Sequence, residues 1–392
     1  MRQRDGLRFF SSPVSNGQMT RLLTIQALAH RAVSLWGKTG RQSAAAKRQR
    51  ADFYKVAWRE AADSLEADLE TLDQDVLAIR KGGKSTRVFL NYTELDDPVS
   101  LRIAGNKPLV HRLLRSQGIP TPAYREFTLK TLADAGEFLQ QHGTCVVKPA
   151  AGTGGGNGVT TGVQTVRQLR QASVVAAGHS SSLIIEQQIA GANIRLLFLD
   201  GQLLDAIDRR PPTVTGDGRS RIGQLVENVN QQRLQAGFSV AQSVLKRDQD
   251  MRQTLAAQGL TLTSVLPVNK TVQLKTVIND NTAEDNICVI DSLNTALIDE
   301  ARSAADAVGL RLAGVDIVTP DASRCLTDAG GVVLEVNSAP GFYFHYAARN
   351  GRTPVAIPVL AACLNCPIDS GAWKVREDAS VSRDLCEVTS TR

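Results

Sequence analysis

Toward its C-terminal end the chain reads Leu334-Glu335-Val336-Asn337-Ser338-Ala339-Pro340-Gly341. Successive side chains of a β-strand point to opposite faces, so Glu335 and Asn337 share one face if this stretch is a strand. The neighbouring positions of residues 332–336 are apolar. A carboxylate without a partner is costly in such surroundings, so the stretch indicates a buried site for a charged group.

Asp316 lies on a second expected strand, residues 315–318, and precedes Glu335 by 19 positions. That spacing fits a strand, a turn and a returning strand that pair with each other. Three oxygen-bearing side chains would then converge, and carboxylate and amide oxygens are the ligands that Mg²⁺ prefers. The alternative is a solvated polar strand face without a metal. The apolar neighbours favour a metal site with Asp316, Glu335 and Asn337 as ligands.

A glycine-rich loop gives the second chemical signal. Lys148 directly follows the apolar run at residues 145–147, and residues 152–158 hold five glycines. Glycine lets backbone N–H groups approach an anion closely, and Lys148 would offset the charge of bound phosphates. A glycine-rich hairpin without a ligand is the alternative, which the loop alone does not exclude.

Taken together, these segments resemble the ATP-grasp superfamily of ligases. The order along the chain matches, from Lys107 ahead of a helix to Lys148 with its loop, a linker at residues 185–191, Asp316 and the stretch 334–341. The ATP-grasp domain of cyanophycin synthetase and that of bifunctional glutathione synthetases are more similar still. The resemblance covers roughly residues 104–365, and it is also carried by residues 209–218, 224–230, 256–275 and 350–358.

The resemblance implies that the chain binds ATP with Mg²⁺, or with Mn²⁺ as an alternative ion. Glu186 would accept a hydrogen bond from the exocyclic amine of adenine, and Asn193 lies where an acid that binds the ribose is usual. The full set implied to contact the nucleotide comprises Lys107, Lys148, Gly154, Gly155, Gly156, Glu186, Gln187, Ile189 and Asn193.

The resemblance also implies a reaction. Arg195, Arg209 and Lys275 fall at basic positions similar to those that face the acyl phosphate and the acid substrate. ATP would phosphorylate a carboxylate, and an amine would then displace the phosphate to form an amide bond. The predicted function is therefore an ATP-dependent carboxylate–amine ligase that acts on a small amino acid or peptide.

Two other functions remain open at this stage. One is a ligase that modifies a protein or peptide terminus, with the basic N-terminal segment docking an acidic partner. The other is a non-catalytic nucleotide-binding regulator with the same fold. The presence of both lysines and all three expected metal ligands speaks against the regulator, because a degenerate site should have lost at least one of them.

Besides Asn193, other features depart from the families that the chain resembles. His111 lies where relatives often have Lys, and we expect it on the surface. Residues 342–346 read Phe-Tyr-Phe-His-Tyr, an aromatic run where the substrate pocket should be. These side chains either line a pocket for a bulkier or more apolar substrate or pack into the core.

The expected fold is α+β, with two α+β subdomains that clamp ATP, preceded by a small α/β N-terminal region. The expected divisions are a basic arm with an amphipathic helix (1–50), a helical or α/β region (51–104), the ATP-grasp domain (105–365, lid about 141–190) and a tail (366–392). Apolar spacing and turn residues predict helices at residues 22–36, 47–77, 108–117 and 294–308. Strands are predicted at residues 87–92, 145–148, 183–186, 195–199, 315–318 and 332–337.

Charge is spread unevenly along the 392 residues. The net charge is +6, but residues 1–50 hold ten Lys or Arg and one acid, Asp5. A basic arm of this kind is either a solvated segment or a contact for an anionic partner. No apolar run approaches the length of a membrane span, and we expect neither nucleic acid nor a membrane as a partner.

The six cysteines are scattered rather than arranged as a disulfide framework. Cys363 and Cys366 form a CxxC motif, but a zinc site would usually need a second pair or nearby histidines. We therefore expect reduced thiols in a cytoplasmic protein. Relatives are often dimers or tetramers, so the resemblance leaves a homo-oligomer open.

Overall fold

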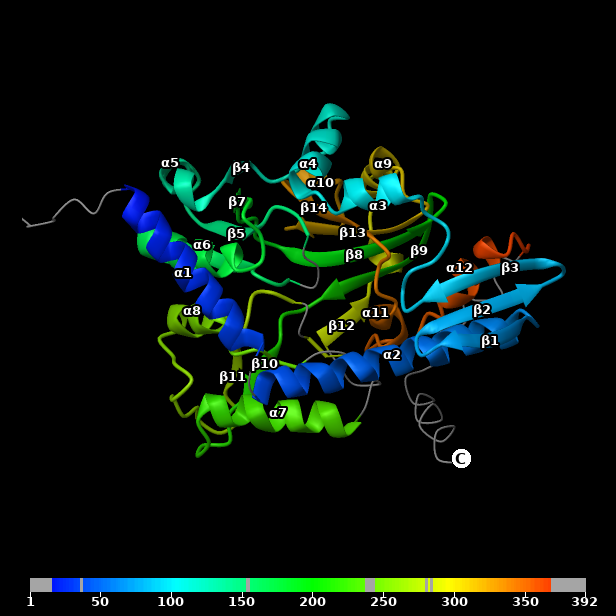
Figure 1. The fold of residues 1–392 in the computed structure, drawn as a ribbon, viewed down its shortest axis with the longest axis horizontal. Helices are drawn as coiled ribbons and strands as arrows, with labels where there is room; N and C mark the ends of the chain where they lie inside the picture. The colour runs from blue at the N-terminus through cyan, green and yellow to red at the C-terminus, as the bar shows by residue number, and fades with distance from the viewer. Residues whose placement is uncertain are drawn as a thin grey trace, which may run out of the picture.

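The computed structural model of the chain describes residues 16–35, 38–152, 156–236, 244–278, 281–282 and 285–367. Within these ranges no helix combines the length and the apolar character needed to cross a membrane. Its helices pack on antiparallel sheets (Figure 1), which confirms the α+β prediction.

A five-stranded antiparallel sheet in the order β12-β9-β8-β13-β14 forms the centre of the molecule. Side chains alternate along β8, so Ile194, Leu196 and Phe198 pack beneath α9 while Leu197 and Leu199 pack on the opposite face. Helices α3, α4 and α9 cover the first face (Figure 1). The bounds are β8 (Ala192–Leu199), β9 (Gln202–Arg209), β12 (Asn286–Cys288), β13 (Leu312–Thr319), β14 (Val332–Ser338), α3 (Pro98–Ala104), α4 (Lys107–Ser116), η4 (Ile290–Ser292), α9 (Thr295–Val308) and α10 (Leu326–Ala329).

The predicted pairing of the two strands near the C-terminal end is confirmed. Strands β13 and β14 run antiparallel, and their register places Asp316 opposite Glu335 and Gly314 opposite Asn337. Strand β8 lies on the other side of β13, with Arg195 opposite Asp316. The register therefore places two acids, an arginine and an amide on one face of the central sheet.

A smaller antiparallel sheet in the order β4-β7-β5-β6 lies beside the central one. Helices α5 and α6 cover one of its faces and form with it a separate apolar core. This unit begins at Tyr124, whereas the lid predicted from the sequence spans about 141–190. The bounds are β4 (Tyr124–Phe127), η1 (Leu129–Thr131), α5 (Leu132–His142), β5 (Cys145–Pro149), β6 (Thr160–Val163), α6 (Val166–Ala177) and β7 (Leu183–Gln187).

A third unit joins the two sheets along one side. Strands β10 and β11 pair, and helices α7 and α8 pack on them around Val226, Met251 and Leu255. In Figure 1 this unit lies below α6 and the smaller sheet. The bounds are β10 (Thr213–Thr215), α7 (Ile222–Ala236), α8 (Gln249–Ala257) and β11 (Thr271–Gln273).

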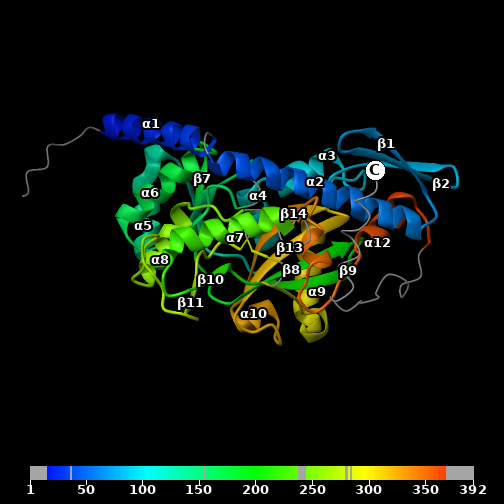
Figure 2. The ribbon, with the colours of Figure 1, turned by 90° about the horizontal axis from the view of Figure 1, so that it is seen from below.

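The N-terminal part contains two long helices and a three-stranded antiparallel sheet. Figure 2 shows α1 and α2 lying along one edge of the molecule, where α2 passes the central sheet and reaches β1 and β2. The bounds are α1 (Asn16–Leu35), α2 (Lys38–Ser64), β1 (Asp68–Asp73), β2 (Val76–Lys81) and β3 (Lys84–Phe89), and α11 (Tyr343–Tyr346) and α12 (Ala356–Cys363) lie near α2.

One expectation for this part was wrong in its extent. The helix expected over residues 47–77 ends at Ser64, because Glu66 takes a left-handed conformation and the next residues pair as a hairpin. On α1, Leu22, Ile25 and Leu28 are each about three-fifths exposed, at 59%, 65% and 63%. Leu23 and Ala27 of the same helix are buried.

Candidate functional site

Lys107 lies at the start of α4, where it reaches the central sheet. Asn106 caps this helix, since its Oδ1 accepts a hydrogen bond from the Leu109 amide at 3.1 Å. The Lys107 ammonium lies 2.8 Å from the Glu335 carboxylate. Burial opposes the charge of Lys107, but Glu335 and the more distant Glu186 hold the pKa of this ammonium above its usual value. The Lys107 amide also donates to the Ala150 carbonyl at 3.1 Å, which fixes the helix start beside the glycine loop.

Lys148 and Glu186 form a second buried pair in the smaller sheet. The Lys148 ammonium lies 2.7 Å from one Glu186 oxygen, and Nε2 of His111 lies 2.9 Å from the other. Burial raises the pKa of Glu186, but the attraction of Lys148 and the bonds to both partners outweigh it and lower the pKa to about 2. Both oxygens of the Glu186 carboxylate, which we expect to accept a hydrogen bond from adenine, therefore already have protein partners.

His111 corrects the expectation of a surface residue. Its side chain is 1% exposed, and its ring lies against Tyr124 with the centroids 5.0 Å apart. The sequence near His111 gives no signal for this pairing, because its partner Glu186 is 75 positions away.

Asp316 is held by two arginines. Nη2 of Arg195 lies 2.7 Å from one carboxylate oxygen, while Nε of Arg195 and Nη2 of Arg209 both donate to the other, Arg209 at 2.7 Å. Burial raises the pKa of Asp316, but the two guanidinium groups outweigh it and lower the pKa to about 2. The two arginines expected from the sequence therefore meet at the expected metal ligand.

Arg209 is also tied to Asn193. Its Nη2 donates to the Asn193 side-chain oxygen at 2.8 Å, and its guanidinium carbon lies 5.7 Å from the centre of the Phe344 ring. Burial and the repulsion of Arg195 lower the pKa of Arg209 to about 10, although Asp316 opposes this. Among the described residues, Nε and Nη1 of Arg209 have no hydrogen-bond partner despite their burial. This guanidinium therefore has donors left for an anion.

The three expected metal ligands are brought together. Glu335 faces Asp316 across the strand pair, and the Asn337 amide nitrogen lies 3.2 Å from the Asp316 carboxylate. Burial raises the pKa of Glu335, but Lys107 and Lys148 outweigh it and hold the pKa below its usual value. No group of three or more His, Cys, Asp or Glu side chains is placed to hold a metal ion in the described ranges. Two carboxylates and one amide nevertheless match the oxygen donors that Mg²⁺ takes.

The glycine loop is described only in part. Gly154 and Gly155 lie outside the described residues, whereas Gly156 has a positive φ of 70°. Gly158 has φ of 77°, and a Cβ there would lie 2.8 Å from the His179 ring, so this position requires glycine. Gln187 and Ile189 follow Glu186 and are half-buried, and the Gln187 amide donates to the Ala123 carbonyl at 2.9 Å.

Lys275 lies in the unit that joins the two sheets. Its ammonium lies 2.6 Å from the Asp248 carboxylate, and the lysine side chain is buried. Nearby, Asp250 accepts from Thr161 of β6 at 2.8 Å and from the Val277 amide at 3.1 Å. Asp248 and Asp250 were missed from the sequence, although their position just before an apolar helical run is typical of helix caps.

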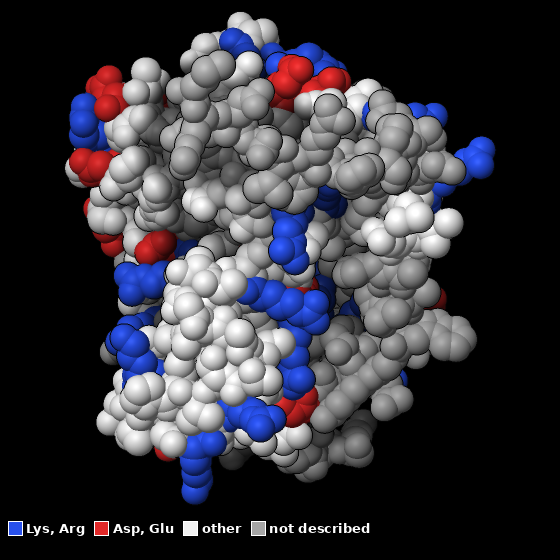
Figure 3. All heavy atoms as spheres, turned by 90° about the vertical axis from the view of Figure 1, so that its left-hand side faces the viewer, with Lys and Arg blue, Asp and Glu red and all other residues white. Residues whose placement is uncertain are grey.

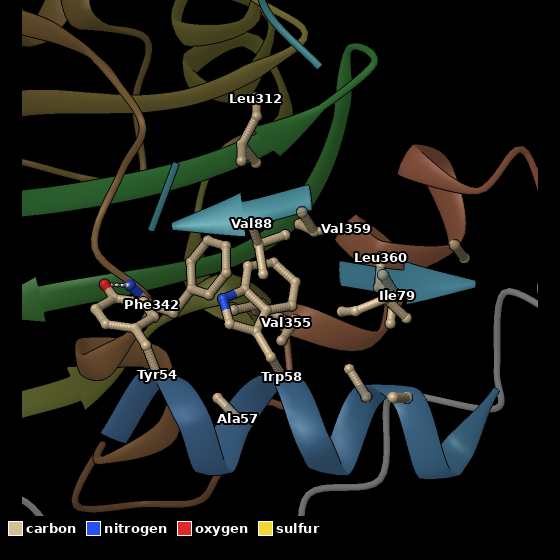
Figure 4. Packing of buried hydrophobic residues seen from close by; sticks show 14 of the residues in the cluster. Tyr54, Ala57, Trp58, Ile79, Val88, Leu312, Phe342, Val355, Val359 and Leu360 are labelled. Carbon is tan, nitrogen blue, oxygen red and sulfur yellow. Dashed lines mark hydrogen bonds between the residues drawn. The ribbon is translucent and has the colours of Figure 1, made fainter. Parts of the chain in front are cut away.

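The aromatic run after β14 packs into the core. Phe342, Tyr343 and Tyr346 are buried among residues of α2 and α12, and Figure 4 shows Phe342 beside Trp58. His345 is also buried, and its Nδ1 lies 2.9 Å from Asp205. Core packing was therefore the correct alternative for these residues, while the half-buried Phe344 lies against Arg209.

Comparison with known proteins places the chain among ligases. Cyanophycin synthetase of Trichormus variabilis (strain ATCC 29413 / PCC 7937) is 31% identical over 273 residues, which are 69% of this chain and 30% of that protein. The glutathione biosynthesis bifunctional protein of Streptococcus thermophilus (strain CNRZ 1066) is 27% identical over 307 residues, 77% of this chain and 40% of that protein. The chain thus spans about 30–40% of the length of these curated relatives.

Among solved structures, a bifunctional glutathione synthetase from Pasteurella multocida matches with a TM-score of 0.49 and 24% identity, over 77% of this chain and 43% of that one. No protein-family model matches the chain. On its sequence similarity to these synthetases, the chain belongs to the ATP-grasp ligase family.

Proposed function

We propose that this chain is an ATP-dependent ligase that joins the carboxylate of a small amino acid or peptide to an amine. The observation that carries the proposal is a set of three ion-pair groups on facing elements, all buried except for the half-buried Glu335. They are Lys107 with Glu335, Lys148 with Glu186, and Asp316 with its two arginines.

Buried charges of this number are expensive to maintain. Removing an ion from water costs several kcal/mol, and a pair inside a protein regains only part of that cost. Apolar residues of similar size would often serve stability as well or better. Charges retained in a sheet that is otherwise apolar therefore point to a ligand that uses them.

The pairs are suited to an exchange of partners when a nucleotide binds. Lys107 and Lys148 would turn their ammonium groups toward phosphate oxygens. Asp316, Glu335 and Asn337 would hold Mg²⁺, or Mn²⁺, which stabilises negative charge on the phosphates. Glu186 would then be free to accept from the adenine amine, with Gln187 and Ile189 beside it.

The bond changes follow from the chemistry of carboxylates. A carboxylate oxygen of the acid substrate attacks the terminal phosphorus of ATP, and the bond from that phosphorus to ADP breaks. The amine then attacks the carbonyl carbon of the acyl phosphate, phosphate leaves with the bonding pair, and the amine loses a proton. No protein nucleophile is required.

Arg209 and Arg195 would face the acid substrate. The Nε and Nη1 donors of Arg209, which have no partner in the described part of the chain, suit a carboxylate or an acyl phosphate. Phe344 lies against the Arg209 guanidinium and restricts its movement. Preorganised donors of this kind stabilise charge that develops during transfer of the phosphoryl group.

The test is ADP release from Mg·ATP in the presence of amino acids and dipeptides, supplied singly and in pairs. We expect release that depends on a pair, with a product whose mass equals the two substrates minus water. ATP binding by calorimetry, without ADP release for any pair, would reject a ligase acting on small molecules and favour a macromolecular substrate or a regulatory role.

A further inference from the structure

The part of the chain before residue 104 packs next to the candidate site. Helix α2 lies against the segment that follows β14, and Figure 4 shows Tyr54, Ala57 and Trp58 pointing from α2 toward Phe342 and Val355. The segment leads out of the strand that carries Glu335 and Asn337. Contacts made by α2 are therefore contacts to the segment that directly follows the site strand β14.

The first of these contacts is a hydrogen bond from the backbone of the segment to α2. The Phe342 amide donates to the buried Tyr54 hydroxyl at 3.1 Å, drawn as a dashed line in Figure 4. A Cβ at Gly341 would lie 3.6 Å from the same hydroxyl, so the backbone passes close over Tyr54. Tyr54 therefore fixes the end of the four-residue stretch 339–342, the 339–342 loop.

The second contact holds the start of the 339–342 loop. The Asn91 amide nitrogen donates to the Ala339 carbonyl, and its oxygen accepts from Nη2 of Arg50 at 2.7 Å. Ala339 has φ of 44°, a left-handed conformation that costs about 1 kcal/mol or more for a residue other than glycine. Such a conformation persists only where its surroundings impose it, and Asn91, which is buried, supplies the partner.

The 339–342 loop lies against Arg195. Gly314 of β13 is covered by both, because a Cβ there would lie 2.8 Å from Cβ of Pro340 and 3.2 Å from Nη1 of Arg195. The loop and the guanidinium therefore share one space over the strand that carries Asp316. A shift of the loop would give Arg195 room to leave its bidentate position on Asp316.

We propose that Tyr54 and Asn91 are positioning residues, which fix the 339–342 loop over Arg195 and make the N-terminal region one wall of the acid-binding subsite. This inference rests on the proposed function for the identity of the substrate, but its geometry does not depend on that function. The N-terminal region would then help to select the acid substrate.

The experiment compares Tyr54→Phe and Asn91→Ala with the unchanged protein. Tyr92→Phe is the matched control, because Tyr92 is half-exposed, lies next to Asn91 and stacks on Phe89. The first measurement is the rate at which phenylglyoxal modifies Arg195, followed by peptide mass spectrometry on the full chain. The second is KM for the acid and KM for ATP, with the pair that releases most ADP in the substrate panel.

We expect faster modification of Arg195 in both variants, and KM for the acid raised about tenfold while KM for ATP stays unchanged. Tyr92→Phe should match the unchanged protein in both measurements. Unaltered modification rates would overturn the inference, and so would a rise in both KM values together, which indicates general loosening. If no pair supports ADP release, the proposed ligase function fails, and the modification rates alone decide whether Tyr54 and Asn91 position Arg195.

Discussion

At the scale of single residues, the site is built from acids whose charge is maintained by buried cations. Glu186 and Asp316 are both buried, yet lysine, histidine and arginine partners lower the pKa of each carboxyl to about 2. A carboxyl whose pKa is lower in the folded than in the unfolded chain stabilises the fold above its unfolded pKa. That contribution disappears as the pH falls toward the folded pKa.

Glu186→Gln should therefore lower stability and flatten its dependence on pH. A fall in the pKa of Glu186 from its usual 4.5 to about 2 corresponds to roughly 3 kcal/mol, present above about pH 5 and lost between about pH 5 and pH 2. The measurement is urea unfolding across that range. Glu126→Gln is the control, because Glu126 makes an exposed ion pair. An equal loss with acid in the variant and the unchanged protein would exclude this role for Glu186.

Glu335→Ala should abolish catalysis while the fold persists. The change removes an expected ligand of Mg²⁺ and the partner of Lys107, so we expect ADP release to fall by about 10² or more. Circular dichroism should remain unchanged. Glu70→Ala, which breaks an exposed pair with Arg80, should retain full activity. Normal turnover in Glu335→Ala would remove Glu335 from the metal site.

At the scale of elements, the sequence predicted those features that depend on residues close together in the chain or on adjacent strands. The β13–β14 pair, the helix from Thr295 to Val308 and the face shared by Glu335 and Asn337 were all readable from alternation and spacing. The burial of His111 was not, because it depends on a glutamate in a distant strand. The expected helix beyond Ser64 failed because hairpin pairing outweighed helix propensity, which only the folded chain shows.

Helix α2 should prove integral to the fold rather than an appendage. Trp58 of α2 is buried in the core that α2 shares with α12. Its indole N–H donates to the Leu90 carbonyl at 2.7 Å. Trp58→Ala should cost about 3–5 kcal/mol of unfolding free energy, since it leaves a cavity and an unpaired carbonyl. Chemical denaturation gives this value. Leu22→Ala on the exposed face of α1 is the control, with an expected change within about 0.5 kcal/mol.

At the scale of the whole molecule, α4 connects the two sheets. Its first residue, Lys107, pairs with Glu335 of the central sheet, and His111 one turn later pairs with Glu186 of the smaller one. Lys148 comes from the smaller sheet, and the glycine loop follows it. A nucleotide bound by both Lys107 and Lys148 would therefore contact both sheets at once. On the surface, Figure 3 shows several Lys and Arg side chains close together toward the middle of the face that carries α5, α6 and α8.

Nucleotide binding should accordingly stabilise the whole chain against heat. At a concentration of Mg·ATP about 100 times its Kd, mass action predicts a gain of about 2.7 kcal/mol, seen as a higher Tm in a thermal melt. In Lys148→Met the gain should shrink, because the smaller sheet loses its cation for the phosphates, whatever the change does to the Tm of the free protein. Lys130→Met is the control, since Lys130 is an exposed lysine of the same subdomain and should leave the gain intact. An equal gain in Lys148→Met and the unchanged protein would show that the nucleotide does not contact the smaller sheet. It would then contradict the proposal that the nucleotide binds between the two sheets.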